Sequence, residues 1–152
     1  MVVDASAIVA ILVEEPMAGA VAGAIEHSRG PFAVSPLTVF EAALAMARAR
    51  GSRRRASTRE DIETALAAVE KLIEALQAEE VPVSADLARA AIAAAARFGR
   101  AVGHPADLNF GDCFSYALAT AREDALLFIG DDFAQTDVRS VLADPRPRRG
   151  AV

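Results

Sequence analysis

The chain has 152 residues, 53% of them hydrophobic, and a formal net charge of −5. This length fits one domain that buries roughly 70% of the surface its unfolded chain would expose, and the apolar content excludes disorder across its main body. A single cysteine excludes an internal disulfide, and no apolar run reaches the ~20 residues needed to cross a bilayer, so we expect a cytoplasmic protein without a membrane segment.

The first part of the chain predicts two units in which a short strand leads into a helix. Residues 2–3 form an apolar strand, and Ser6 is a suitable N-cap for the apolar segment that follows. Residues 31–36 give the next strand signal. A helix is predicted over residues 37–51, because Ser35 is a preferred capping residue and is followed by a proline suited to the first turn.

The middle of the chain contains the clearest helical pattern. Thr58 and Asp61 form a capping box at its start, and apolar residues then recur on one face. A third strand is predicted at residues 81–83, and a further helix extends from Ser84 to Phe98. The apolar face of the first of these helices comprises Ile62, Leu66, Val69, Ile73 and Leu76.

The last third of the chain predicts another helix and the strand that follows it. Asn109 is a preferred N-cap for a helix over residues 109–119, and residues 125–130 have the compact apolar character of a central strand. A final short strand is predicted over residues 138–142. The apolar stripe of the helix comprises Phe110, Phe114, Ala117 and Leu118.

Short, uniformly apolar strands that alternate with helices are typical of a parallel sheet covered on both faces. With right-handed crossovers, the pattern predicts the α/β class, a three-layer α/β/α sandwich with a central parallel sheet. We expect a single domain over residues 1–143, followed by a flexible tail over residues 144–152, which is polar and broken by prolines.

Acidic residues are predicted to gather at one edge of this sheet, where ligands of open α/β sheets bind. Each acid also has an ordinary explanation: a helix cap, a turn residue, or a side chain at the margin of an apolar helix face. Capping does not require the first or third acid, because Ser6 and Asn109 are suitable caps nearby. The acids are Asp4, Glu41, Asp112, Asp131 and Asp132.

A divalent cation would resolve the repulsion between these carboxylates, which otherwise raises their pKa values. Oxygen ligands favour Mg²⁺ or Mn²⁺, whereas a zinc site would normally recruit histidine or cysteine. His27 and His104 are predicted in surface loops, and Cys113 has no recognisable partner base, so we interpret it as a buried structural thiol. Ser115 and Tyr116 are suited to position a phosphate, although packing explains them equally well.

The positive charges are segregated although the net charge is negative. Arginine clusters are suited to contact phosphates or an acidic protein, but solvated arginines on a loop and at a terminus would give the same pattern. The first cluster comprises Arg48, Arg50, Arg53, Arg54 and Arg55, and the second comprises Arg146, Arg148 and Arg149.

Four ordered segments, which together span nearly the whole chain, resemble the PIN-domain family, and more closely its VapC branch, the ribonuclease half of bacterial toxin–antitoxin pairs. They are VVDASAIVAIL, LTVFEAALAMARARG, LNFGDCFSYALA and LLFIGDDFAQTDV. The resemblance implies an endoribonuclease toxin that hydrolyses RNA phosphodiester bonds with Mg²⁺, for which Mn²⁺ can substitute. It also implies a homodimer and a VapB-type antitoxin that silences the nuclease by inserting a segment near the acids.

The resemblance also implies roles for individual residues. Asp4, Glu41 and Asp112 are the metal-site acids, with Asp4 and Asp112 as ligands. Either Asp131 or Asp132 is the fourth acid, with Asp137 as a more remote candidate. The residues expected to contact the RNA are Ser6, Ser115, Arg48 and Arg50, joined by the arginines at 53–55.

Three alternatives remain open at this point. A catalytically silent module with the same fold would use the basic loop to hold RNA or a protein. A phosphoacceptor receiver domain would need a lysine near its acids, but the only lysine, Lys71, lies in the middle of a predicted helix. A haloacid-dehalogenase-like phosphatase would lack the same lysine, and its usual D-x-D pair has Ser6 in the second acidic position.

Overall fold

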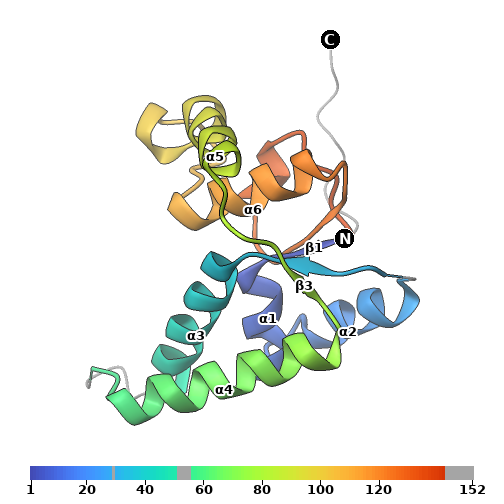
Figure 1. The fold of residues 1–152 in the computed structure, drawn as a ribbon, viewed down its shortest axis with the longest axis vertical. Coiled ribbons are helices and arrows are strands. Elements are labelled where there is room, and N and C mark those ends of the chain that lie inside the picture. Colours follow the sequence, from blue (N-terminus) through green and yellow to red (C-terminus); the bar gives the residue numbers. More distant parts are fainter. Residues whose placement is uncertain (29, 51–55, 143–152) are drawn as a thin grey trace.

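A computed structural model describes residues 1–28, 30–50 and 56–142 of the chain (Figure 1). The predicted tail at 144–152, the arginines at 53–55 and the expected helix end at Gly51 lie outside these residues. The elements run in the order β1 (Val2–Val3), α1 (Ala5–Leu12), α2 (Ala18–His27), β2 (Ala33–Val34), α3 (Pro36–Arg50), α4 (Arg59–Ala75), β3 (Glu79–Glu80), α5 (Ala85–Phe98), η1 (Arg100–Val102), α6 (Phe110–Ala121), β4 (Leu126–Leu127) and η2 (Phe133–Gln135), where η marks a 3-10 turn.

The described strands form one parallel sheet with the order β3-β2-β1-β4. Val2 is in register with Ala33 of β2 and with Leu126 of β4. The chain first builds the sheet outward from β1 through β2 to β3, and then returns through α5 and α6 to place β4 on the other side of β1. The carboxyl ends of β1 and β4 therefore flank the point where the strand order reverses, the usual location of a ligand site.

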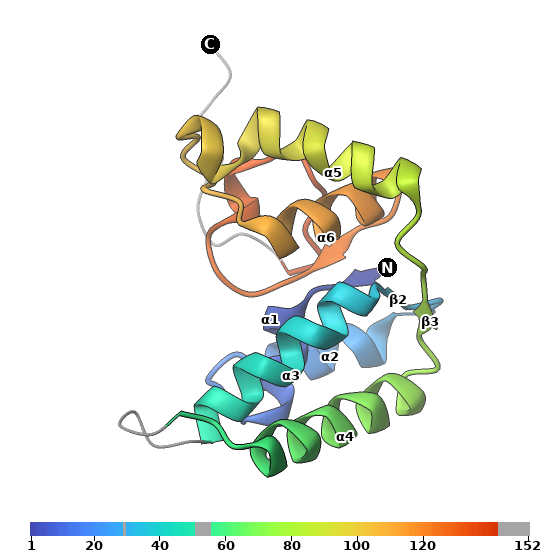
Figure 2. The same cartoon turned by 60° about the vertical axis from the view of Figure 1, so that its left-hand side comes forward.

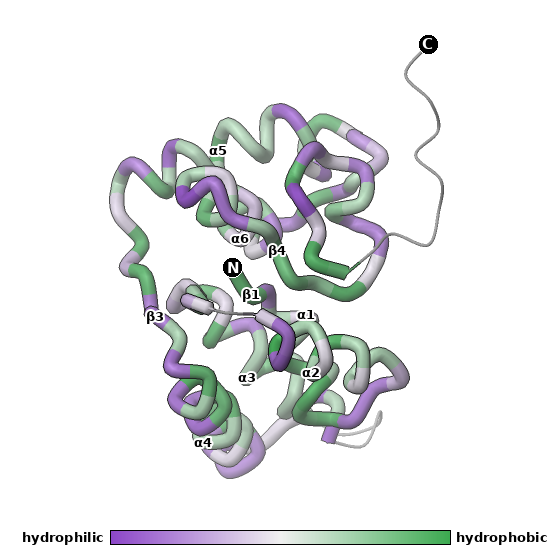
Figure 3. The backbone as a smooth tube through the Cα atoms, turned by 90° about the vertical axis from the view of Figure 1, so that its right-hand side faces the viewer, coloured by the Kyte–Doolittle hydropathy of each residue, from purple (hydrophilic) through white to green (hydrophobic). Residues whose placement is uncertain are grey.

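Helices cover both faces of the sheet, as predicted. Figure 2 shows α5 and α6 on one side of the strands and α1 to α4 on the other. Successive strand residues point to opposite faces, so Val2 packs in the cluster with α5 and α6 whereas Val3 packs in the cluster with α1, α3 and α4. Figure 3 shows hydrophobic colouring along β4, between these layers. The α/β/α sandwich is confirmed.

The predicted third and last strands are wrong in detail. Strand β3 lies at Glu79–Glu80 rather than at 81–83, and both of its glutamates are exposed. An edge strand needs only backbone pairing to one neighbour, so the apolar signal of residues 81–83 was not the deciding one. The strand expected over residues 138–142 is reduced to a parallel bridge between Leu126 and Ser140.

The helix caps were predicted more accurately than the buried faces of the helices. Ser84 caps α5, and the capping box of Thr58 with Asp61 opens α4. Helix α2 was not predicted, and its last residue is His27, which therefore does not lie in a loop. Leu66 and Phe110 are exposed, because Ala65 and Phe114 occupy the buried faces of their helices instead. None of the described helices has the length and apolarity needed to span a membrane.

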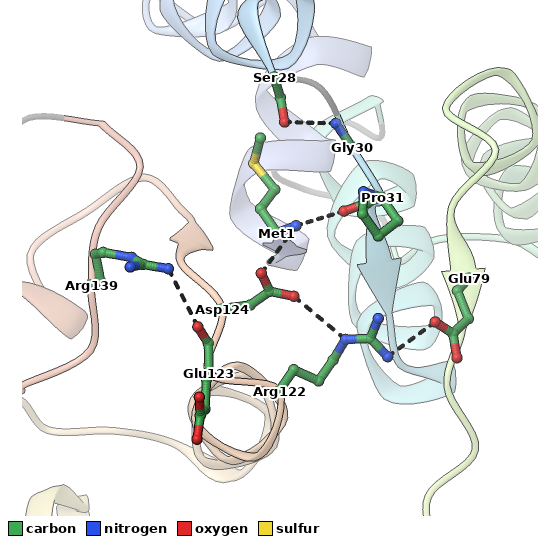
Figure 4. Close-up of polar contacts among 9 residues, drawn as sticks. All are labelled: Met1, Ser28, Gly30, Pro31, Glu79, Arg122, Glu123, Asp124 and Arg139. Carbon is green, nitrogen blue, oxygen red and sulfur yellow. Dashed lines mark hydrogen bonds and ion pairs between the residues drawn. The ribbon is translucent and has the colours of Figure 1, made fainter.

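Opposite charges alternate at the amino ends of the strands (Figure 4). Arg122, just after α6, pairs through Nη1 with Glu79 Oε2 at 3.0 Å, and its Nε lies 3.5 Å from Asp124 Oδ2. The amino group of Met1 donates to the Pro31 carbonyl at 2.6 Å and lies 3.6 Å from Asp124 Oδ1. This network ties the segments before β1, β2 and β4 to the edge strand β3.

Candidate functional site

Asp4 follows β1 directly and is almost completely buried. It caps α1, because its Oδ2 accepts hydrogen bonds from the Ser6 backbone N–H at 2.9 Å and from the Ser6 hydroxyl at 2.6 Å. The prediction that Ser6 would cap this helix is therefore wrong, because the helix begins at Ala5, one residue before Ser6. The Ser115 hydroxyl in α6 donates to Asp4 Oδ1 at 2.7 Å, and the Ser6 oxygen accepts from Ile129 N–H at 3.0 Å. Three segments thus hold one carboxylate.

Asp112 is the third residue of α6 and is half-buried. Asn109 caps the helix, as predicted, but Asp112 takes part because its Oδ2 accepts from the Asn109 N–H at 2.8 Å. Burial raises the pKa of Asp112 to about 6, with Asp4 and Asp132 adding repulsion, while the Asn109 hydrogen bond and the Arg100 charge lower it. The cap and the proposed site role therefore coexist in one side chain.

Glu41 reaches the same place from α3. Burial raises its pKa to about 7, with further repulsion from Asp4 and Asp112 and an opposing effect from Arg48. The close approach depends on Gly111, because a Cβ atom at that position would overlap the Glu41 carboxylate. Residues 41 and 111 therefore fix how α3 and the start of α6 meet, and Glu41 and Asp112 are brought together with Asp4.

Two consecutive acids, Asp131 and Asp132, follow β4. Both are exposed. Burial, Asp107 and Asp131 raise the pKa of Asp132, and Asp4 adds a smaller repulsion. Asp132 also raises the pKa of Asp112, which links it to the acids of α6 and β1.

Asp137, the more remote candidate, is engaged elsewhere. Its Oδ1 accepts from the Tyr116 hydroxyl at 2.6 Å, and its Oδ2 pairs with Arg97 Nη1 at 3.0 Å. The hydrogen bond from Tyr116 lowers its pKa, in contrast to the acids described above. Tyr116 is buried, and its hydroxyl is engaged in the hydrogen bond to Asp137.

The donor atoms that gather here are carboxylate oxygens, which suit a hard divalent cation better than zinc. Cys113 is buried and burial raises its pKa, which suits packing. His104 is half-buried against Phe98, with ring centroids 5.2 Å apart, and accepts from Ala106 N–H. In the described part of the chain, no group of three or more His, Cys, Asp or Glu side chains is closely enough arranged to hold a metal ion. The donor chemistry fits Mg²⁺, although the carboxylates do not converge on one point.

Two described arginines act on these acids from opposite sides. Arg48, exposed in the last turn of α3, lowers the pKa of Glu41, and Arg50 is exposed two residues further on. Arg100, in the turn after α5, lowers the pKa values of Asp112 and Asp132. The basic residues predicted to contact RNA thus include one with an electrostatic effect on the acids, and the structure adds Arg100.

The sequence profile of the PIN domain matches residues 1–139. The chain belongs to the PIN-domain family. A VapC ribonuclease of Rhizobium meliloti (strain 1021) is 41% identical to this PIN domain over 138 residues, which cover 90% of the chain and 97% of the relative. Ribonuclease VapC28 of Mycobacterium tuberculosis (strain H37Rv) is 40% identical over 142 residues, or 93% and 98% of the two chains. Ribonuclease VapC42 of the same strain is 39% identical over 139 residues, or 91% and 97%. The family resemblance predicted from the four segments is confirmed.

Sequence reasoning missed two residues of this PIN domain. Gly111 had a usable signal, because an isolated glycine inside a helical pattern often marks a close approach. Arg100 had no such signal, since it stands alone outside the arginine clusters and its position depends on how the loop before α6 folds.

Proposed function

We propose that this PIN domain is a ribonuclease toxin of the VapC type that hydrolyses RNA phosphodiester bonds with Mg²⁺. The observation that carries the proposal is the gathering of Asp4, Glu41 and Asp112 at the carboxyl edge of the sheet. Two of these acids have pKa values raised to about 7 and about 6, as expected of carboxylates that lack a cation. The names of the relatives, which are VapC ribonucleases over almost their whole length, support RNA as the substrate.

Each acid has a proposed role. Asp4 and Asp112 are the metal ligands, and Glu41 and Asp132 complete the acidic site. Asp132 is preferred to Asp131 because its charge raises the pKa of Asp112 and because Asp4 in turn raises the pKa of Asp132. The chemistry that a bound Mg²⁺ supplies is activation of water and stabilisation of charge on the leaving oxygen, and Mn²⁺ can substitute.

Other residues have supporting roles in this proposal. Ser6 and Ser115 hold the Asp4 carboxylate in a fixed orientation through their hydroxyls. If they also contact the RNA, as the resemblance implied, they do so from this position. Arg48 and Arg50 guide the RNA backbone toward the acids, because arginine neutralises phosphate charge.

The wider biology is proposed from the VapC names of the relatives. We expect residues 1–143 to act as one domain, the protein to form a homodimer, and a VapB-type antitoxin to silence it in the cytoplasm, where the cell's RNA lies. The exposed Phe40, which precedes Glu41, and the exposed Phe110, two residues before Asp112, are consistent with a surface that is covered in an assembly.

The test is incubation of the purified protein with a pool of cellular RNAs, with Mg²⁺ or with EDTA, followed by mapping of new RNA ends. We expect new ends at defined sequences in the Mg²⁺ sample only. Asp4→Asn, which keeps the size of the side chain, is the matched control and should yield none. Wild-type protein without metal-dependent ends would contradict the proposed function.

A catalytically silent binding module is the second candidate, because no three carboxylates converge on one point in the described residues. Isothermal titration with Mn²⁺ separates the two functions. The nuclease should bind Mn²⁺ in a manner that Asp4→Asn abolishes, whereas a silent module would bind none in either form.

A further inference from the structure

The loop between α5 and α6 is fastened at both ends beside the acidic site. Arg100 N–H donates to the Leu108 carbonyl at 3.0 Å, and Leu108 N–H donates to the Phe98 carbonyl at 3.2 Å. Gly99 allows this closure, because a Cβ atom there would lie 2.5 Å from the Ala95 carbonyl oxygen. The residue after Leu108 is Asn109, the N-cap of α6. The loop is therefore fixed relative to Asp112, three residues further on.

Arg100 is held in place by an acid of the same loop. Its Nε and Nη2 both donate to Asp107 Oδ2, at 3.0 Å and 2.8 Å. Asp107 adopts a left-handed backbone with φ of 49°, which is uncommon for a residue other than glycine. The side chain of Arg100 is 67% exposed, and its contact with Asp107 uses two of its five N–H groups. The guanidinium is thus oriented by one carboxylate while most of its donors face outward.

A purely structural role explains this arrangement poorly, because an ion pair at this exposure contributes little to stability. The charge of Arg100 instead acts on the site, since it lowers the pKa values of Asp112 and Asp132. On the other side, Arg48 does the same for Glu41. An anionic substrate that approaches these acids is repelled by them and needs cations placed beside them.

We propose that Arg100 binds a phosphate group of the RNA substrate next to the acidic site, and that Asp107 positions its guanidinium for that contact. The inference rests on the proposed ribonuclease function. It adds a residue from the loop between α5 and α6, which carries none of the acids proposed as metal ligands. A guanidinium with outward-facing N–H groups matches the oxygens of a phosphate, and one that is already oriented loses less freedom on binding.

The experiment uses single-turnover cleavage of a short single-stranded RNA that contains a mapped cleavage site, over a range of RNA and salt concentrations. Arg100→Ala should raise the half-saturating RNA concentration about 10-fold and leave the maximal rate within about 3-fold. The dependence of log affinity on log salt should become shallower by about 0.7, the value for one phosphate contact on a single strand. Arg100→Lys keeps the charge and should recover part of the loss.

The matched control is Arg89→Ala. Arg89 is also an exposed arginine paired with a nearby acid, Asp86, at 2.9 Å, but it lies in the first half of α5. Arg89→Ala should leave the half-saturating RNA concentration and the salt dependence unchanged. Asp107→Asn removes the acid but keeps the Arg100 charge, and should raise the half-saturating concentration less than Arg100→Ala does. Thermal melting of each variant reports whether it is folded. If Arg100→Ala does not fold, the half-saturating RNA concentrations of Arg100→Lys and Asp107→Asn decide the question instead.

The outcomes separate this inference from the function on which it rests. Wild-type protein that cleaves no RNA overturns the proposed function and this inference with it. Wild-type protein that cleaves, together with Arg100→Ala that behaves like Arg89→Ala, overturns the inference alone. A loss confined to the maximal rate, with the salt dependence unchanged, also overturns it.

Discussion

The two ends of the parallel sheet carry charge in opposite ways. At the carboxyl end, Glu41 and Asp112 lie with other acids, and burial together with repulsion from neighbouring acids raises their pKa values. At the amino end, Arg122 lies between Glu79 and Asp124, so that unlike charges alternate. The ion pairs at the amino end therefore stabilise the fold, whereas the repulsion between acids at the carboxyl end destabilises it until a cation binds there. Such a division is typical of proteins whose site residues lower stability.

Asp112→Asn should give the largest effect at the carboxyl end. We expect cleavage of RNA to fall on the order of 100-fold or more, because one of the two carboxylates proposed as metal ligands is lost. The metal-free protein should become more stable, since one source of repulsion disappears and the amide oxygen can still accept from Asn109. Cleavage assays and thermal melting in EDTA measure the two effects. Asp86→Asn, at an exposed first-turn acid of α5, is the control. Undiminished cleavage would remove Asp112 from the site.

Gly111→Ala tests the contact that brings α3 and α6 together. The added methyl group would displace the Glu41 carboxylate, which is the end of a flexible side chain, so we expect the free energy of unfolding to fall by no more than about 1 kcal/mol and cleavage to fall about 10-fold. Gly19→Ala in α2 is the control, because nothing lies within 4 Å of its added atom, and it should stabilise the protein by about 0.5–1 kcal/mol. Urea unfolding measures the stability of both variants, and cleavage assays measure their activity. Equal behaviour of the two variants would mean that the Glu41 contact is unimportant.

Arg122→Ala tests the amino end. It removes the cation of Glu79 and one of the two cations beside Asp124, which keeps the Met1 amino group. We therefore expect the free energy of unfolding to fall by about 1–2 kcal/mol, less than for a fully buried pair because these groups are partly exposed. RNA cleavage should remain at the wild-type rate at temperatures where the variant is folded. Arg89→Ala, at a fully surface pair, should change stability by no more than about 0.5 kcal/mol. A selective loss of activity without loss of stability would break the contrast between the two ends.

The pH dependence of the metal-free protein should show the smallest effect. The folded pKa values of Glu41 and Asp112 are raised from 4.5 to about 7 and from 3.8 to about 6, so their contribution to stability is complete below about pH 4 and is lost as pH rises through 6 and 7. After allowance for solvent screening, we expect a decrease on the order of 1 kcal/mol between pH 4.5 and 7.5. Urea unfolding in EDTA measures it. The double variant Glu41→Gln with Asp112→Asn should lack this decrease, and the same slope in both proteins would contradict the raised pKa values.

The fold was predictable where local chemistry decides structure. The capping residues Thr58, Ser84 and Asn109 set helix starts by hydrogen bonds within four residues, and the apolar segments before Asp4 and Asp131 marked β1 and β4. The expectation that the second of these would be a central strand is wrong, because β4 ends the strand order. Strand β3 was misplaced because its position depends on backbone pairing with β2 and not on its own glutamates. Helix α2 was missed because its alanines and glycines give a weak apolar periodicity.

The acids of the site were predictable as a set, since the ends of parallel strands meet at one edge. Their geometry was not. The sequence suggested Ser6 as the cap of α1, whereas contacts with Ser115 and Ile129 hold Ser6 and Asp4 together from more than 100 residues away. Local patterns contain no information on such contacts, and the same holds for Arg100, whose orientation depends on Asp107 seven residues later.

The hydrogen bonds around Asp4 also bear on how the protein is made. Asp4 leaves the ribosome well before its partner Ser115, which follows 111 positions later, and the link from Ser6 to Ile129 spans 123 positions. At synthesis rates of about 5–20 residues per second, the acid waits several seconds or longer for its partners. A nascent chain that has not yet exposed α6 and β4 has no assembled site. For the proposed toxin, this chain order delays activity until the ribosome has passed α6 and β4.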